Sequence, residues 1–158
     1  MKFIRVRGTE KRIKVGKIIC LGQNYPKHAK EMGSRAPSLP HFFLKPTTSL
    51  LPDGGTVLLP RLSRCVHHEI ELYFVIGKKG KNILKEEADE HILGYGIFFD
   101  ITARDIQREG KKTGRPFGLS KCFDTFAPVS EITLAEEVGG WRGAQDLKII
   151  LKTNFNVK

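Results

Sequence analysis

Short runs in which apolar and polar residues alternate recur along the chain, and this period of two is typical of strands. The pattern predicts strands over residues 15–21, 42–44, 56–59, 67–77, 94–102, 127–134 and 146–157. Short helices are predicted over residues 25–32, 84–91 and 105–109. Neither a repeat nor a linker divides the chain. We therefore expect residues 1–158 to form a single domain of mainly β structure with short helices, an α+β fold.

Two of the apolar runs contain acidic residues, where an unpaired carboxylate costs several kcal/mol. Glu69 and Glu71 lie two apart in the run 67–77, so a strand directs both side chains to one face, about 6.5 to 7 Å apart along the backbone. Asp100 lies near the end of the run 94–102. Three carboxylates that converge among apolar residues favour a hard divalent cation, Mg²⁺ or Mn²⁺ before Zn²⁺.

A second arrangement of the Glu-x-Glu strand is open from its spacing alone, because many antiparallel sheets have one wet face. In that arrangement Glu69 and Glu71 face solvent, and the core-facing residues are Ile70, Leu72 and Phe74. The spacing does not distinguish an acidic cluster from a half-solvated strand.

The chain carries a net charge of +10, with basic clusters at residues 11–14, 78–81 and 111–112. Aromatic residues are not interleaved with these clusters, and the spacing of a recognition helix or a zinc finger is not found. We interpret the clusters as a solvated surface. Neither a nucleic acid nor a membrane is expected as a partner.

The sequence favours a cytosolic protein with free thiols. Its first residues do not resemble a secretion signal, and its apolar runs are shorter than the roughly 18 residues that a spanning helix needs. Cys20, Cys65 and Cys122 are odd in number and widely spaced, which argues against a disulfide framework or a zinc ribbon.

Six motifs follow one another over roughly residues 16 to 130: CLGQNY at 20–25, HAKEM at 28–32, FLKP at 43–46, HHEIE at 67–71, GYGIFFDITARDIQ at 94–107 and SKCFD at 120–124. In content and order they resemble the fumarylacetoacetate hydrolase family, especially its branch of acylpyruvate hydrolases and oxaloacetate decarboxylases. Gln23 stands where the family commonly has arginine, and Phe117 where it commonly has tryptophan. We expect the first difference to shift substrate preference and the second to be tolerated in packing.

The resemblance implies a fold of rolled, mixed or antiparallel sheets around a metal, and a homodimer. It assigns Glu69, Glu71 and Asp100 as ligands of Mg²⁺ or Mn²⁺. The implied enzyme is a metal-dependent hydrolase or lyase that cleaves a C–C bond in a small 2-oxo acid, by acylpyruvate hydrolysis or oxaloacetate decarboxylation. In both reactions the cation would act as a Lewis acid and stabilise an enolate.

Other functions stay open at this point. Within the family, an isomerase or decarboxylase of unsaturated 2-hydroxy dicarboxylates in aromatic catabolism needs the same metal. From a different class, the chain would be an inactive remnant or a basic nucleic-acid binder, whose affinity falls with salt and does not respond to Mg²⁺.

The resemblance also assigns residues to the substrate pocket. Lys45, Arg104 and Gln107 match substrate-binding positions, and Lys121 matches a catalytic one. Cations there would offset the charge of the carboxylates and of a dianionic substrate. From residue type alone, the alternatives are surface lysines, an ion pair of Arg104 with Asp105 or another acid, and a helix-surface amide.

His28 and Glu31 lie three residues apart on the predicted helix 25–32 and resemble the family's catalytic lid dyad. In such a dyad the carboxylate orients an imidazole, which polarises water for attack on an acyl carbon. This pair would serve hydrolysis. The alternative is a solvated amphipathic helix.

The three other histidines near the candidate motifs receive mainly structural interpretations. His67 shares the strand face of Glu69 and Glu71, and we favour a packed histidine over a fourth ligand or a ligand-orienting group. His68 points the other way and is expected in the core or an interface. His41 is expected to be structural.

The chain stops at Lys158, after residues 148–157, which resemble a strand that in the family leads to further strands and a late Gly-Thr-Pro segment closing the pocket. Without those strands we expect an exposed sheet edge and an opened core. The expected unit is therefore a C-terminally incomplete catalytic domain: a truncated product, a fragment or a pseudoenzyme. Metal binding is a safer expectation than turnover.

Overall fold

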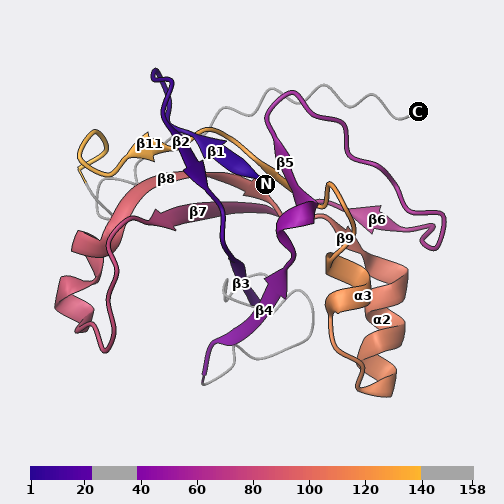
Figure 1. Cartoon of the computed structure of the whole chain (residues 1–158). Helices are drawn as coiled ribbons and strands as arrows, with labels where there is room; N and C mark the ends of the chain where they lie inside the picture. The colour runs from indigo at the N-terminus through magenta and orange to yellow at the C-terminus, as the bar shows by residue number, and fades with distance from the viewer. Residues whose placement is uncertain (23–38, 140–158) are drawn as a thin grey trace.

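Short strands dominate the structure, a computed structural model that describes residues 1–22 and 39–139 (Figure 1). The strands are β1 (Phe3–Arg5), β2 (Arg12–Lys14), β3 (Ile18–Gly22), β4 (His41–Lys45), β5 (Leu50–Pro52), β6 (Val66–His67), β7 (Ile70–Ile76), β8 (Ile92–Phe99), β9 (Thr102–Ala103), β10 (Ala127–Val129) and β11 (Thr133–Leu134). The helical segments are the 3₁₀ turns η1 (Thr47–Ser49) and η2 (Lys85–His91) and the α-helices α2 (Arg104–Thr113) and α3 (Gly118–Lys121). The predicted mainly β fold with short helices is confirmed.

The central sheet is built around β8, which pairs with β7 along nearly its whole length. On the other side of β8 lie β11 and β10, and β10 continues to β5. The β5–β10 pair is parallel and the other pairs are antiparallel, so the sheet is mixed. Gly94 allows β11 to approach β8, because a Cβ at this position would lie 2.4 Å from the Thr133 carbonyl oxygen.

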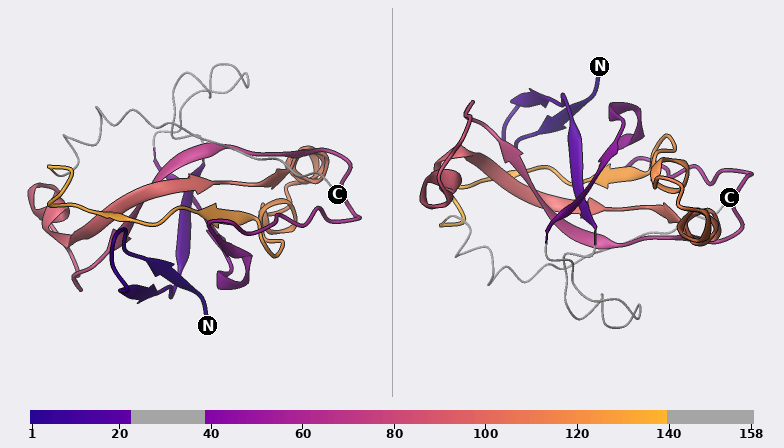
Figure 2. Two further views of the ribbon diagram at one scale, coloured as in Figure 1. Left: turned by 90° about the horizontal axis from the view of Figure 1, so that it is seen from above. Right: turned by 90° about the horizontal axis from the view of Figure 1, so that it is seen from below.

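Three small ribbons surround this sheet, formed by the antiparallel pairs β1–β2, β3–β4 and β6–β9. The β3–β4 ribbon runs across the direction of β7 and β8, as Figures 1 and 2 show from different sides. Helix α2 starts directly after β9, and α2 and α3 lie together at the end of the sheet where β8 stops.

Two apolar clusters form the core of the described residues. The larger cluster joins β1, β3, β5, β8 and β10 and contains Phe98. The smaller cluster contains Ile101, Ala103 and Phe126. Asp100 lies between Phe98 and Ile101 in the sequence, so this acidic residue sits where the two clusters meet.

The faces of β7 are opposite to those in the solvated-strand alternative. Tyr73 and Val75 pack against the larger cluster, on the same side of the strand as Glu71. Ile70 and Phe74 are instead 49% and 50% exposed. The alternative in which these apolar residues face the core is therefore wrong, and the acidic side of the strand is the inner one.

Some predicted elements differ from the observed ones. Residues 56–59 form no strand, and Leu58 and Leu59 are 63% and 55% exposed. The strand of this region is β5, which pairs with β10 and ends before the turn at Gly54. The predicted helical turn at 105–109 is a longer helix, α2, which ends at Gly114 in a left-handed conformation with φ of 68°.

Other expectations are confirmed or lie elsewhere in the chain. The predicted strand at 42–44 corresponds to β4, and the predicted helix at 84–91 to the 3₁₀ segment η2. The predicted helix 25–32 and strand 146–157 lie outside the described residues. Within the described ranges, a helix long and apolar enough to cross a membrane is not found.

Candidate metal and substrate site

Three acidic side chains meet at one end of the β7–β8 hairpin. Glu69 directly precedes β7, Glu71 lies within it, and Asp100 directly follows β8. The hairpin's backbone pairing continues past the strands, because the Glu69 N–H donates to the Asp100 carbonyl at 3.3 Å and the Asp100 N–H donates to the Glu69 carbonyl at 2.8 Å. One carboxylate oxygen of each residue lies within 4.8 Å of the other two. The structure thus brings together the three acids that the sequence singled out.

The donor set fits a hard divalent cation. Asp100 is 1% exposed, and its Oδ1 lies 2.8 Å from the Lys45 ammonium. The Glu71 carboxylate makes no hydrogen bond within residues 1–22 and 39–139. Mg²⁺ and Mn²⁺ take carboxylate oxygens at about 2.1 Å, so two ligand atoms on one ion lie up to about 4.2 Å apart. The acidic cluster is close to that spacing, and Glu69, Glu71 and Asp100 are the residues that would hold the ion.

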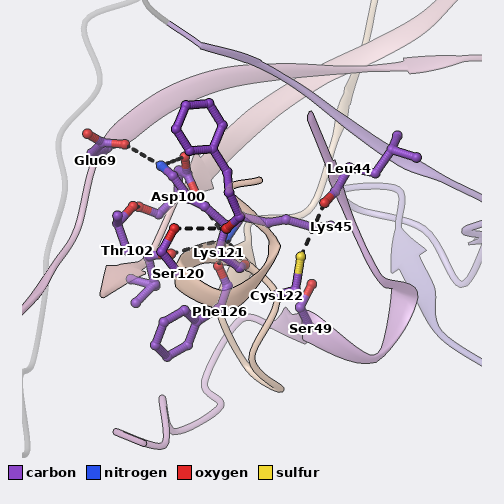
Figure 3. Close-up of polar contacts among 12 residues, drawn as sticks. Leu44, Lys45, Ser49, Glu69, Asp100, Thr102, Ser120, Lys121, Cys122 and Phe126 are labelled. Carbon is purple, nitrogen blue, oxygen red and sulfur yellow. Dashed lines mark hydrogen bonds and ion pairs between the residues drawn. The ribbon is translucent and has the colours of Figure 1, made fainter. Parts of the chain in front are cut away.

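Three cationic side chains contact the acidic cluster directly, those of Lys45, Arg104 and Lys121. Figure 3 shows Lys45 and Lys121 beside Asp100. Lys121, at the end of α3, donates from Nζ to Glu69 Oε2 at 2.9 Å and also to Asp100 Oδ2. Arg104, at the start of α2, donates from Nη2 to Glu69 Oε1. Its Nη1 donates to Gln107 Oε1 at 2.8 Å.

The surface alternatives for Lys121 and Gln107 are wrong, because Lys121 is 4% exposed and Gln107 is 9% exposed. The alternative of an ion pair between Arg104 and an acid is confirmed, with Glu69 as the partner and not Asp105. Asp105 instead accepts hydrogen bonds from the Ser63 hydroxyl and from main-chain N–H groups. The substrate-binding and catalytic roles of Arg104, Gln107 and Lys121 stay predictions.

Lys45 is also buried, which excludes the surface alternative for this lysine. It is 2% exposed and donates to three main-chain carbonyls, those of Lys121 at 2.7 Å, Phe126 at 2.8 Å and Ile101 at 3.1 Å. Burial is the main cause that lowers the pKa of its ammonium, and the nearby Asp100 charge opposes this shift.

Burial and neighbouring charges separate the pKa values of the two glutamates. Burial alone would raise the pKa of Glu69, but the Lys121 ammonium and the Arg104 guanidinium outweigh it and hold the pKa at about 2. For Glu71, burial and then the negative charges of Asp100 and Glu69 raise the pKa to about 7. The difference arises because only Glu69 is hydrogen-bonded to the cations.

The histidines lie at the edge of this arrangement. His67 is exposed, and its Nε2 lies 3.6 Å from Cys65 Sγ. His68 is exposed with its ring edge-on to Phe99 at 6.0 Å between centroids, so its expected core position is wrong, and its position in an interface stays a prediction. His28 and Glu31 lie outside the described residues, and their catalytic role stays a prediction.

Two contributions to the site were not found from the sequence. The Phe43 ring lies 5.1 Å from Lys121 Nζ, a cation–π contact from the middle of β4. The carbonyls that bind Lys45 carry no residue-type signal, because every residue has one. Phe43 and Lys45 both belong to the FLKP motif, and this motif is the sequence feature that could have pointed to both contributions.

Several known proteins that resemble this chain are named as enzymes. Residues 17–158 match the family model described as Fumarylacetoacetate (FAA) hydrolase C-terminal. The mitochondrial oxaloacetate tautomerase FAHD1 of Bos taurus is 42% identical over 141 residues, which are 89% of this chain and 62% of that protein. The mitochondrial oxaloacetate decarboxylase of Dictyostelium discoideum is 47% identical over 115 residues, 72% of this chain and 53% of that protein.

A solved structure shares the fold. The fumarylpyruvate hydrolase of Pseudomonas aeruginosa, in complex with Mn²⁺ and pyruvate, superposes with a TM-score of 0.81 at 37% identity, over 87% of this chain and 61% of that one. The chain spans between about half and three-fifths of the length of these relatives. The family model covers most of the chain, and the mainly β fold with its acidic cluster accords with it. This chain belongs to the fumarylacetoacetate hydrolase family.

Proposed function

We propose that the chain binds one Mg²⁺ or Mn²⁺ ion through Glu69, Glu71 and Asp100. The observation that carries this proposal is that one carboxylate oxygen of each of the three acids, with the buried Asp100 among them, lies within 4.8 Å of the other two. A divalent cation would offset the repulsion among the three acids. The Mn²⁺ ion in the fumarylpyruvate hydrolase structure supports the same class of ion.

The proposed substrate is a small 2-oxo acid, the class to which the pyruvate in that structure belongs. Charge balance supports a dianionic member of the class. The three acids are matched by three cationic side chains, those of Lys45, Arg104 and Lys121. A bound divalent cation would add two positive charges to this balance, and a dianionic substrate would then offset them.

The chain's own residues would then hold the substrate and its developing charge. When bound, the metal ion would supply a Lewis acid for the keto oxygen. Arg104 is fixed by Glu69 and Gln107, and its guanidinium has donors left over for a carboxylate. Lys121 Nζ uses two of its three protons on Glu69 and Asp100, so the third can serve the reacting atoms.

The proposed reaction is cleavage of a C–C bond next to the keto group, by acylpyruvate hydrolysis or oxaloacetate decarboxylation. Both release charge onto the keto oxygen, where the cationic side chains would stabilise it. Hydrolysis also requires an activated water, which we assign to the His28 and Glu31 pair. Decarboxylation does not require it, so His28→Ala should impair acylpyruvate cleavage far more than oxaloacetate decarboxylation.

A tautomerase or isomerase is the second candidate. The relative from Bos taurus, 42% identical to this chain, is named an oxaloacetate tautomerase. This reaction moves a proton and breaks no C–C bond, so the third proton of Lys121 could suffice. It would need the same metal site and would not depend on His28.

One set of assays separates these candidates. Pyruvate release from oxaloacetate and from an acylpyruvate, and enol–keto conversion of oxaloacetate, are measured with Mg²⁺ or Mn²⁺ and with a chelator, each against the metal-only background. Asp100→Asn removes a proposed ligand. Glu131→Gln is the matched control, because Glu131 is an exposed acid whose nearest cation, Arg5, lies 3.9 Å away. We expect metal-dependent turnover that falls at least 100-fold in Asp100→Asn only, and turnover that survives this change or the chelator would contradict the proposal.

The homodimer and the cytosolic location also stay proposals. Sedimentation of the purified chain would test the first. The relatives from Bos taurus and Dictyostelium discoideum are mitochondrial proteins, so imaging of the tagged chain in its own cells is the test of the second.

A further inference from the structure

We propose that Lys45 is a positioning residue of this site, in place of the substrate ligand that its motif predicts. Its buried ammonium fixes Asp100 and Lys121 relative to each other. The roles of Asp100 and Lys121 in this inference come from the proposed function. The way in which they are held comes from the contacts of Lys45.

All donor capacity of Lys45 is used within the protein. An ammonium group has three protons, and Nζ donates to three carbonyl oxygens at 2.7, 2.8 and 3.1 Å. Its fourth close neighbour is Asp100 Oδ1, which forms an ion pair with it at 2.8 Å. Four acceptor oxygens thus surround three protons, and Lys45 has no proton to offer a substrate.

The three carbonyls belong to separate segments that build the site. Ile101 follows Asp100 and separates β8 from β9, Lys121 ends α3, and Phe126 precedes β10. One ammonium thus joins the main chain beside a proposed metal ligand to the main chain of the proposed catalytic lysine. Figure 3 shows the Lys45 side chain entering this cluster from β4.

The surroundings of Nζ keep water away from these contacts. Its side chain has no exposed surface, and the rings of Phe98 and Phe126 lie 6.0 and 5.8 Å from the nitrogen. Hydrogen bonds in such a setting hold their geometry firmly, because leaving a buried carbonyl without a donor is costly. The arrangement is a cation site made of oxygen atoms, filled by the protein's own ammonium.

The chemistry of the contacts requires lysine. Arginine presents its donors in a flat fork and cannot direct three of them at oxygens that converge on one point. Methionine has a similar length and packs well, but it leaves three carbonyls and Asp100 without their cation. Lys45→Arg and Lys45→Met should therefore both displace Asp100 and Lys121.

The test compares Lys45→Met and Lys45→Arg with Lys2→Met in the full chain. Lys2 is the matched control, because its Nζ donates to a single carbonyl, that of Leu50, at 2.8 Å. Mn²⁺ affinity is read from the electron paramagnetic resonance signal of the free ion, and kcat and KM are measured for oxaloacetate. We expect both Lys45 variants to bind Mn²⁺ at least tenfold more weakly and to lose kcat at least 100-fold with little change in KM. For Lys2→Met we expect the Mn²⁺ affinity, kcat and KM to stay within twofold of wild type.

A substrate ligand would give the opposite result, a raised KM with wild-type Mn²⁺ affinity, and that outcome would overturn the inference. A second measurement on the wild-type chain covers variants that fail to fold. Nitrogen-15 NMR should detect one lysine ammonium whose protons exchange slowly with water and show cross-relaxation to the rings of Phe98 and Phe126. Rapid exchange of every lysine ammonium would overturn the inference. Wild-type protein that binds no Mn²⁺ would contradict the proposed function alone, since the NMR measurement decides the position of Lys45 independently.

Discussion

Replacing Glu71 by glutamine should move stability and metal binding in opposite directions. In the metal-free protein Glu71 is a half-buried carboxylate without a hydrogen bond to the described residues. Burial, with the charges of Asp100 and Glu69, raises its pKa from 4.5 to about 7. The folded protein therefore binds this proton more tightly than the unfolded chain does, and ionised Glu71 destabilises the fold.

The size of the effect follows from the shift. Each pKa unit corresponds to about 1.4 kcal/mol, so a rise from 4.5 to about 7 sets an upper bound of about 3 kcal/mol. Because Glu71 is only half-buried, solvent screens part of the repulsion, and we expect about 1 to 2 kcal/mol. The folded pKa lies above the unfolded one, so the penalty is absent below pH 4.5, grows as the pH rises, and is complete above pH 7.

Urea unfolding in a chelator, at pH 5 and pH 8, measures this penalty. We expect Glu71→Gln to be more stable than wild type by about 1 to 2 kcal/mol at pH 8 and by much less at pH 5. The exposed control Glu131→Gln should stay within about 0.5 kcal/mol at both values. Without chelator, Glu71→Gln should bind Mn²⁺ at least tenfold more weakly. A variant that is less stable than wild type at pH 8 would refute this account of the acidic cluster.

Three further experiments test the packing and the titrating groups of the fold. Gly94→Ala would place a Cβ 2.4 Å from a β11 carbonyl oxygen and should lower the free energy of unfolding by about 2 kcal/mol. Gly16→Ala is the control, because a Cβ there would have no atom within 4 Å, and equal thermal stability of the two variants would contradict the prediction. Burial raises the pKa of Cys20 to about 12, so iodoacetamide at pH 8 should modify the half-buried Cys65 well before Cys20, and mass spectrometry would reveal the reverse order. Hydrogen bonds from a hydroxyl and main-chain N–H groups lower the pKa of Asp105 to about 2, so Asp105→Asn should destabilise the protein above pH 4 and no longer at pH 2. Hydrogen exchange near β6 measures the stability of the variant and of wild type, and a stability difference that stays the same from pH 4 to pH 2 would contradict this.

The sequence allowed the position of the acidic cluster to be predicted because its geometry is local. Two residues two apart on a strand share a face whatever the rest of the chain does. Asp100 was added because it closes a second apolar run and because the family resemblance assigns it as a ligand, and the structure shows that the β7–β8 register pairs it with Glu69. The spacing could not decide which face is inner, since that depends on the cations brought by Arg104 and Lys121.

The contacts of Lys45 could not be predicted in the same way. They are made to carbonyls 56, 76 and 81 residues away in the chain, and a main-chain carbonyl has no residue-type signature. The length of α2 was also underestimated, because its polar sequence lacks a clear apolar period and its end depends on Gly114. The loop that follows β5 was mistaken for a strand because Leu58 and Leu59 are apolar but exposed.

The central claim is that Glu69, Glu71 and Asp100 share one divalent cation. Crystals grown with Mn²⁺ and measured at a wavelength where manganese scatters anomalously would test it most directly. The account predicts a single strong anomalous peak at about 2.2 Å from an oxygen of each of the three residues. A peak elsewhere, or a cluster that stays metal-free at millimolar Mn²⁺, would contradict it.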